Sequence, residues 1–225
     1  MMTATNDLTI DFAALRSAMV ASQLRPNAVN DPRLVTAMAE VPRENFLPAA
    51  VGALAYRDTA VPIGGGRSAN VPIATGKLLT EAYLRATDKV LLIGAGAGYT
   101  AAVLSRLVAS VVAVEVDSAL AEQARTNLAD AANVTVVEGP LPAGAPDHAA
   151  YDVLIVDGAV EKLPDALIDQ VAIGGRVVTG IVDRGVTRLA TGKRSAGGFG
   201  LSDFADIDCV VLPGFAAPAS FSFSR

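Results

Sequence analysis

The most informative part of this sequence for the fold is Leu91-Leu92-Ile93-Gly94-Ala95-Gly96-Ala97-Gly98-Tyr99. An apolar run, Lys89–Ile93, leads into a G-x-G-x-G turn, and a helical pattern over residues 99–107 follows it. Glycines in such a turn let the backbone approach a ligand closely, and the helix behind them presents free N–H groups. The stretch therefore predicts a strand, a ligand-binding turn and a helix. A tight turn that binds nothing is the alternative.

The same alternation continues beyond this unit. Short β-branched runs alternate with amphipathic patterns, which predicts an α/β fold with a doubly wound, mostly parallel sheet. The tail differs, because two strand-like runs flank Ser195-Ala196-Gly197-Gly198 and predict a terminal antiparallel hairpin. The expected strands are 89–93, 111–116, 134–138, 151–156 and 174–182, the hairpin strands are 185–194 and 199–212, and the expected helices are 99–107, 118–131 and 163–171.

The N-terminal part reads as a helical extension of this core. Residues 11–25 and 73–84 show helical periodicity, and Asp31-Pro32 is a typical helix start. Residues 48–68 look irregular. We expect a single domain over 1–225, with N-terminal helices and a loop over 1–85 and the Rossmann-like core over 86–225.

Composition excludes several classes of protein. The 225 residues carry 18 Lys and Arg against 23 Asp and Glu, a net charge of −5, so bulk nucleic-acid or membrane-surface binding is not expected. Apolar residues make up 52%, which argues against global disorder. A single cysteine, Cys209, and a single histidine, His148, argue against a disulfide or a metal site. Residues 1–9 lack a leader pattern and no apolar run reaches the ~20 residues of a membrane span, so we expect a cytoplasmic protein.

Glu115 strengthens the case for a nucleoside ligand. It ends the strand that follows the glycine turn, where a carboxylate can accept hydrogen bonds from both ribose hydroxyls. The G-x-G-x-G spacing departs from the dinucleotide form G-x-G-x-x-G. It resembles the S-adenosylmethionine site of class I methyltransferases, in which an antiparallel strand also lies near the C-terminal end of the sheet.

The N-terminal segments narrow the resemblance to one family. They look like the corresponding part of protein-L-isoaspartate O-methyltransferases, which ordinary class I methyltransferases lack. The similarity covers residues 19–182 and is carried by Met19-Val20-Ala21-Ser22-Gln23-Leu24, Ala37-Met38, Val41-Pro42-Arg43-Glu44-Asn45-Phe46-Leu47-Pro48, Tyr56-Arg57-Asp58, Pro62-Ile63-Gly64, Leu163-Pro164, Gln170-Val171 and Gly174-Gly175-Arg176-Val177.

The resemblance implies a repair enzyme. Such an enzyme transfers methyl from S-adenosylmethionine to isoaspartyl carboxylates of damaged proteins and releases S-adenosylhomocysteine. The ester then collapses to a succinimide that partly reopens as aspartate. A carboxylate nucleophile with a pKa near ~4 is already ionised at pH 7, so no general base is needed. The cofactor residues implied by the resemblance are Gly94, Gly96, Gly98, Glu115, Val116, Pro140 and Leu141.

Three positions depart from the family pattern. Asn70 stands where the family has its catalytic Ser, and an amide N–H can donate to a carboxylate as a hydroxyl does. Leu92 replaces an acid that helps hold the ammonium group of the cofactor. Pro140 replaces an Asp that faces the adenine. Two alternatives therefore stay open, namely a catalytically altered member that binds peptides and a methyltransferase for another acceptor.

Three further residues are candidates for acceptor contacts. Arg67 and Ser68 lie in the loop that contains Asn70, and Asp157 comes at the end of the strand over 151–156. Arg67 can attract an acceptor carboxylate, and a solvent-facing arginine is the alternative. Asp157 can touch substrate at the carboxyl edge of the sheet, or it can cap the following turn.

Overall fold

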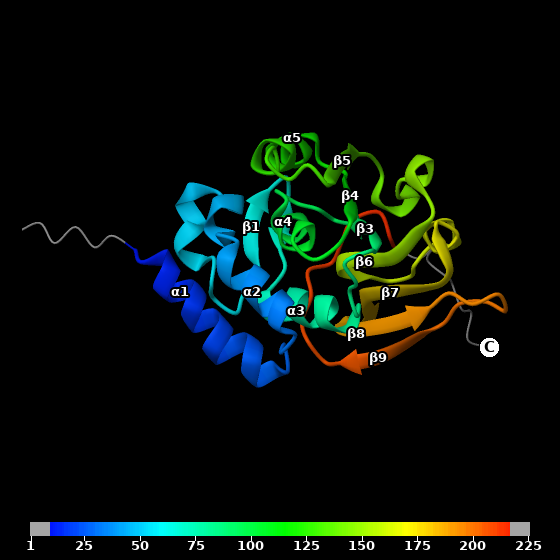
Figure 1. The fold of residues 1–225 in the computed structure, drawn as a ribbon, viewed down its shortest axis with the longest axis horizontal. Coiled ribbons are helices and arrows are strands. Elements are labelled where there is room, and N and C mark those ends of the chain that lie inside the picture. The colour runs from blue at the N-terminus through cyan, green and yellow to red at the C-terminus, as the bar shows by residue number, and fades with distance from the viewer. Residues whose placement is uncertain (1–9, 217–225) are drawn as a thin grey trace, which may run out of the picture.

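A seven-stranded sheet runs through the centre of the computed structural model, which describes residues 10–216 (Figure 1). The strand order is β5-β4-β3-β6-β7-β8-β9. Neighbours from β5 to β7 pair in parallel, and β8 runs antiparallel to both β7 and β9. The mostly parallel α/β sheet with an antiparallel C-terminal part is thereby confirmed. The strands are β3 (Lys89–Ile93), β4 (Ser110–Glu115), β5 (Val134–Glu138), β6 (Tyr151–Val160), β7 (Val171–Asp183), β8 (Val186–Lys193) and β9 (Leu201–Ala205).

Aspartates begin several of the helices. Asp11, Asp31 and Asp117 each accept a hydrogen bond from a backbone N–H in the first turn of the helix that follows, which satisfies a donor that the helix itself leaves free. The helices are α1 (Phe12–Met19), α2 (Pro32–Glu40), α3 (Pro72–Glu81), α4 (Tyr99–Ser105), α5 (Ser118–Asn127) and α6 (Asp165–Ile168). No helix within residues 10–216 is long and apolar enough to cross a membrane.

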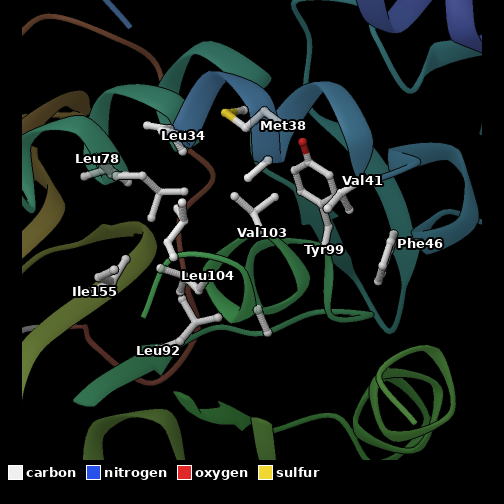
Figure 2. Packing of buried hydrophobic residues seen from close by; sticks show 14 of the residues in the cluster. Leu34, Met38, Val41, Phe46, Leu78, Leu92, Tyr99, Val103, Leu104 and Ile155 are labelled. Atoms are coloured by element: carbon white, nitrogen blue, oxygen red, sulfur yellow. The ribbon is translucent and has the colours of Figure 1, made fainter. Parts of the chain in front are cut away.

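The apolar core lies on both faces of the sheet. Because side chains alternate along a strand, Val90 and Leu92 of β3 join one buried cluster, and Leu91 and Ile93 join the other. The first cluster also contains side chains of the N-terminal extension, and Figure 2 shows Met38 beside Val103 of α4. The extension therefore packs on the same core as the sheet.

Several boundaries differ from the sequence expectation, and four of them bear on the site or on its surroundings. The helix expected over 11–25 stops being α-helical at Met19, and a π-helical segment (Val20–Leu24) and a 3-10 turn (Arg25–Asn27) follow. The helix expected over 163–171 shrinks to α6, because β7 already begins at Val171. Strand β6 runs on to Val160, so Asp157 lies within the strand. Strand β9 ends at Ala205, so Cys209 follows the last strand.

The segment expected to be irregular, 48–68, is also ordered. It contains a 3-10 segment (Ala49–Leu54) and an antiparallel hairpin of β1 (Val61–Gly64) and β2 (Arg67–Ala69). Gly64, Gly65 and Gly66 turn the chain with φ of 101°, 58° and 70°, a left-handed run that only glycine adopts without strain. The hairpin carries Ile63 and Arg67 onto the glycine turn that follows β3.

Candidate functional site

The register of the sheet brings three predicted site residues into one row. Ile93 of β3 pairs with Val114 of β4 and with Val156 of β6. Gly94 follows Ile93 along the chain, Glu115 follows Val114, and Asp157 follows Val156. Since the three strands are parallel, these residues share the carboxyl edge of the sheet, where open α/β sheets bind their ligands.

The glycine turn is folded tightly against other parts of the chain. Gly94 and Gly96 have φ of 85° and 53°. A Cβ atom on Gly94 would lie 2.9 Å from Cδ1 of Leu212, and one on Gly96 would lie 2.9 Å from Cδ1 of Ile63. The glycines therefore permit a close approach, and the groups that approach are side chains of this chain itself.

Glu115 is fully buried and fully engaged. Its Oε1 accepts hydrogen bonds from Nη1 of Arg67 at 2.5 Å, from the N–H of Val116 at 2.9 Å and from the N–H of Asp117 at 3.1 Å. Its Oε2 accepts from the N–H of Gly96 at 2.7 Å. The Arg67 side chain is 8% exposed, so this ion pair lies inside the protein. The alternative of a solvent-facing Arg67 is wrong.

A small cavity of about 30 Å³ remains between the hairpin and the glycine turn. A water molecule needs roughly 10–15 Å³ measured in this way, so the space suits one or two waters. Six of the predicted residues line it, together with Arg43. Those six are Arg67, Ser68, Asn70, Gly94, Gly96 and Asp157.

Asn70 sits in a network of polar side chains. Its Nδ2 donates to Oδ1 of Asp157 at 3.2 Å, and the Asp157 carboxylate also accepts from the hydroxyls of Thr75 and Thr100, at 3.1 and 2.5 Å. The side-chain Oδ1 of Asn70 accepts hydrogen bonds from the backbone N–H groups of Val71 and Val210, at 3.2 and 3.3 Å. Asn70 thus ties β2 to β6 and to the C-terminal segment.

Cys209 lies next to Asn70. Its Sγ is 3.8 Å from Asn70 Nδ2, and burial raises the pKa of the thiol to about 12. The thiol therefore stays protonated at neutral pH and is a poor nucleophile.

Arg43 is a site residue that the chemical reading of the sequence did not single out. It is 2% exposed, its Nη2 donates to the carbonyl of Asn70 at 2.6 Å, and its Cζ lies 4.7 Å from the ring centroid of Tyr99. Within residues 10–216, Nε of Arg43 and the hydroxyl of Tyr99 are buried without a hydrogen-bond partner. Arg43 belongs to the segment 41–48 that carries the family resemblance, which was a signal that it could be functional. Its burial could not be predicted from the sequence, because burial depends on tertiary packing.

Other predicted residues lie away from the cavity. Val116 is 44% exposed and contributes its backbone N–H to Glu115. Pro140 is exposed, and Leu141 is buried in the cluster on the other face of the sheet. Gly98 packs against Leu128 of the α5 end. Over the described residues, no group of three or more His, Cys, Asp or Glu side chains could hold a metal ion.

Two curated relatives of this chain are protein-L-isoaspartate O-methyltransferases. A protein-L-isoaspartate O-methyltransferase 1 of Rhodopseudomonas palustris is 39% identical over 194 residues, covering 85% of this chain and 79% of that one. A protein-L-isoaspartate O-methyltransferase of Koribacter versatilis is 36% identical over 215 residues, covering 95% and 96%.

Solved structures agree in fold. A protein-L-isoaspartate O-methyltransferase superposes with a TM-score of 0.76 at 26% identity, covering 88% of this chain and 66% of that one. A putative enzyme of the same name from Plasmodium falciparum, solved with S-adenosyl-L-homocysteine, superposes with a TM-score of 0.75 at 17% identity, covering 88% and 97%.

The family model described as protein-L-isoaspartate(D-aspartate) O-methyltransferase matches residues 15–212, which include α1 from Leu15 onward, α2, the hairpin and the whole sheet. The chain belongs to the protein-L-isoaspartate(D-aspartate) O-methyltransferase family of class I methyltransferases.

Proposed function

We propose that this protein transfers the methyl group of S-adenosylmethionine to the free carboxylate of isoaspartyl residues in proteins and peptides. The observation that carries the proposal is the match of the family model over residues 15–212. It extends over the N-terminal segment as well as the sheet, so it covers the side of the cavity formed by Arg43, Ser68 and Asn70.

The residues at the carboxyl edge suit the cofactor in chemical type. The Glu115 carboxylate can accept from ribose hydroxyls, and the turn 94–98 offers backbone in close approach. The space is filled, however, because Arg67, Ile63 and Leu212 occupy the region above the turn. Binding therefore requires these side chains to move. When bound, the cofactor supplies a methyl group on a sulfonium, which is an electrophile.

The acceptor needs no activation by a base. Its carboxylate is ionised at neutral pH, so the protein has to align it, hold it and exclude water. Asn70 Nδ2 lies at the cavity and is oriented by Asp157 through the 3.2 Å hydrogen bond. An amide held in this way can donate to one oxygen of the acceptor carboxylate and leave the other to attack.

Arg43 stabilises this arrangement through the backbone of Asn70. Its guanidinium holds the Asn70 carbonyl at 2.6 Å and so fixes the backbone of the residue that faces the acceptor. It also places a positive charge on the wall of a cavity that is proposed to take a carboxylate. We assign Arg43 as a positioning residue.

A second function is favoured by the filled cofactor region. A cavity of about 30 Å³ is far below the roughly 300–1,000 Å³ of typical ligand pockets. A family member that binds isoaspartyl or unfolded peptides without methyl transfer would fit a region that stays closed.

Methyl transfer separates the two functions. Labelled S-adenosylmethionine at saturating concentration is incubated with the protein and either an isoaspartyl peptide or its aspartyl twin. The proposal expects base-labile label on the isoaspartyl peptide alone. Binding of the isoaspartyl peptide without label would favour the second function. If neither peptide is labelled and neither binds, both proposed functions are rejected.

A further inference from the structure

The buried pair of Arg67 and Glu115 occupies the position where a nucleoside ligand would meet the sheet. Glu115 ends β4, and its Oε1 holds Arg67 Nη1 at 2.5 Å. Nη2 of the same guanidinium lies 3.5 Å from the place of a Cβ on Gly94. The guanidinium therefore bridges the acid and the glycine turn, the two features that a ribose would contact.

We propose that Arg67 exchanges one carboxylate for another: it pairs with Glu115 in the free protein and with the acceptor carboxylate once the cofactor holds Glu115. This inference rests on the proposed function. It gives Arg67 two successive partners and makes cofactor binding precede recognition of the acceptor charge.

Glu115 can release Arg67 without losing all of its partners. The backbone N–H groups of Gly96, Val116 and Asp117 still donate to its oxygens. Hydroxyls of a ribose can replace the guanidinium as further donors. A buried ion pair also contributes little net stability, because its attraction is offset by the cost of removing both charges from water. The exchange at Glu115 is therefore feasible.

Arg67 cannot remain unpaired after its release. A buried guanidinium without an anion is strongly unfavourable, whereas a carboxylate can bind it through two parallel hydrogen bonds. Arg67 and Asn70 belong to the same short segment and line the same cavity. A carboxylate presented to Asn70 thus arrives where the freed guanidinium needs an anion.

The hairpin that carries Arg67 is suited to the movement. It contains only β1 and β2 and forms a sheet separate from the central one. The hairpin can shift without breaking a strand pair of the central sheet.

Calorimetry with Arg67→Gln tests the first half of the exchange. S-adenosylhomocysteine is titrated into the wild type, Arg67→Gln and the control Arg106→Gln, which removes an exposed arginine paired with Glu40. Because Gln does not compete as a cation for Glu115, we expect Arg67→Gln to bind at least about fivefold more tightly, the lower end of typical couplings. The control should match the wild type.

Peptide binding tests the second half. With saturating S-adenosylhomocysteine, the wild type should prefer an isoaspartyl peptide over its isoasparagine analogue, whose amide is neutral. Arg67→Gln should lose this preference, and Arg67→Lys should keep part of it because it retains the charge. Without S-adenosylhomocysteine, the wild type should not distinguish the two peptides, a measurement that needs no variant.

Three outcomes overturn the exchange. One is equal or weaker S-adenosylhomocysteine binding by Arg67→Gln, and another is a charge preference that survives in this variant. The third is a charge preference of the wild type that does not depend on S-adenosylhomocysteine. If the wild type methylates isoaspartyl peptides while any of these holds, the exchange fails and the proposed function stands. If neither wild type nor Arg67→Gln binds S-adenosylhomocysteine, the proposed function fails as well.

Discussion

At the scale of single residues, the buried hydroxyl of Tyr99 gives a prediction about stability. Its hydroxyl is buried without a hydrogen-bond partner among the described residues, and burial raises its pKa. Tyr99→Phe removes an unsatisfied polar group and should leave the free energy of unfolding unchanged or raise it by up to about 1 kcal/mol. Urea denaturation measures this. A loss of more than about 1 kcal/mol would show that the hydroxyl has a stabilising partner.

Asn70 should behave in the opposite way. Asn70→Ala leaves the N–H groups of Val71 and Val210 without their acceptor and removes one of the two donors to Oδ1 of Asp157. We expect a loss of about 1–3 kcal/mol in urea denaturation, together with loss of methyl transfer. Asn27→Ala is the control, since Asn27 is exposed and donates one hydrogen bond to a nearby carbonyl, and it should change stability by less than about 0.5 kcal/mol. Equal effects of the two substitutions would contradict the network.

At the scale of elements, the turn of the β1–β2 hairpin offers a matched pair of substitutions. Gly65 and Gly66 both have a left-handed φ, 58° and 70°. A Cβ on Gly65 would collide with Asp117, whereas one on Gly66 meets nothing within 4 Å. Gly66→Ala should cost about 1–2 kcal/mol in backbone strain, and Gly65→Ala should cost more. Urea denaturation measures the loss of unfolding free energy in both variants. Equal losses would show that the turn does not pack closely against Asp117.

The elements also show what the sequence could predict. The sheet core was predictable because its signals are local, namely β-branched runs and the glycine turn after Ile93. The β1–β2 hairpin was missed because its strands are short and its place depends on distant contacts. The site row of Gly94, Glu115 and Asp157 follows from strand register. The partner of Glu115 did not follow, because Arg67 is 48 residues away along the chain and meets it only in the folded protein.

At the scale of the whole molecule, buried hydroxyls and the thiol make stability sensitive to alkaline pH. Burial raises the pKa of Tyr56 and Tyr151 from 10 to about 12, and that of Cys209 from 9 to about 12. The folded state favours the protonated forms. Their contribution to stability is complete below pH 9 and is lost as the pH rises toward 12.

We therefore expect the free energy of unfolding to fall steadily between pH 9 and 11. Urea denaturation at intervals of half a pH unit measures it, with absorbance at 295 nm reporting ionisation of tyrosine. Tyr151→Phe should show a shallower fall than the wild type. A free energy that is constant or rises over this interval would contradict the burial of these groups.

Repair of isoaspartyl residues is measured by the conversion of an isoaspartyl peptide into its aspartyl form. An isoaspartyl peptide is incubated with the protein and S-adenosylmethionine, and its aspartyl twin is quantified by chromatography. We predict that the aspartyl peptide accumulates over repeated cycles of methylation and succinimide opening, and that omission of S-adenosylmethionine abolishes this accumulation. No aspartyl peptide above the protein-free control would contradict the claim.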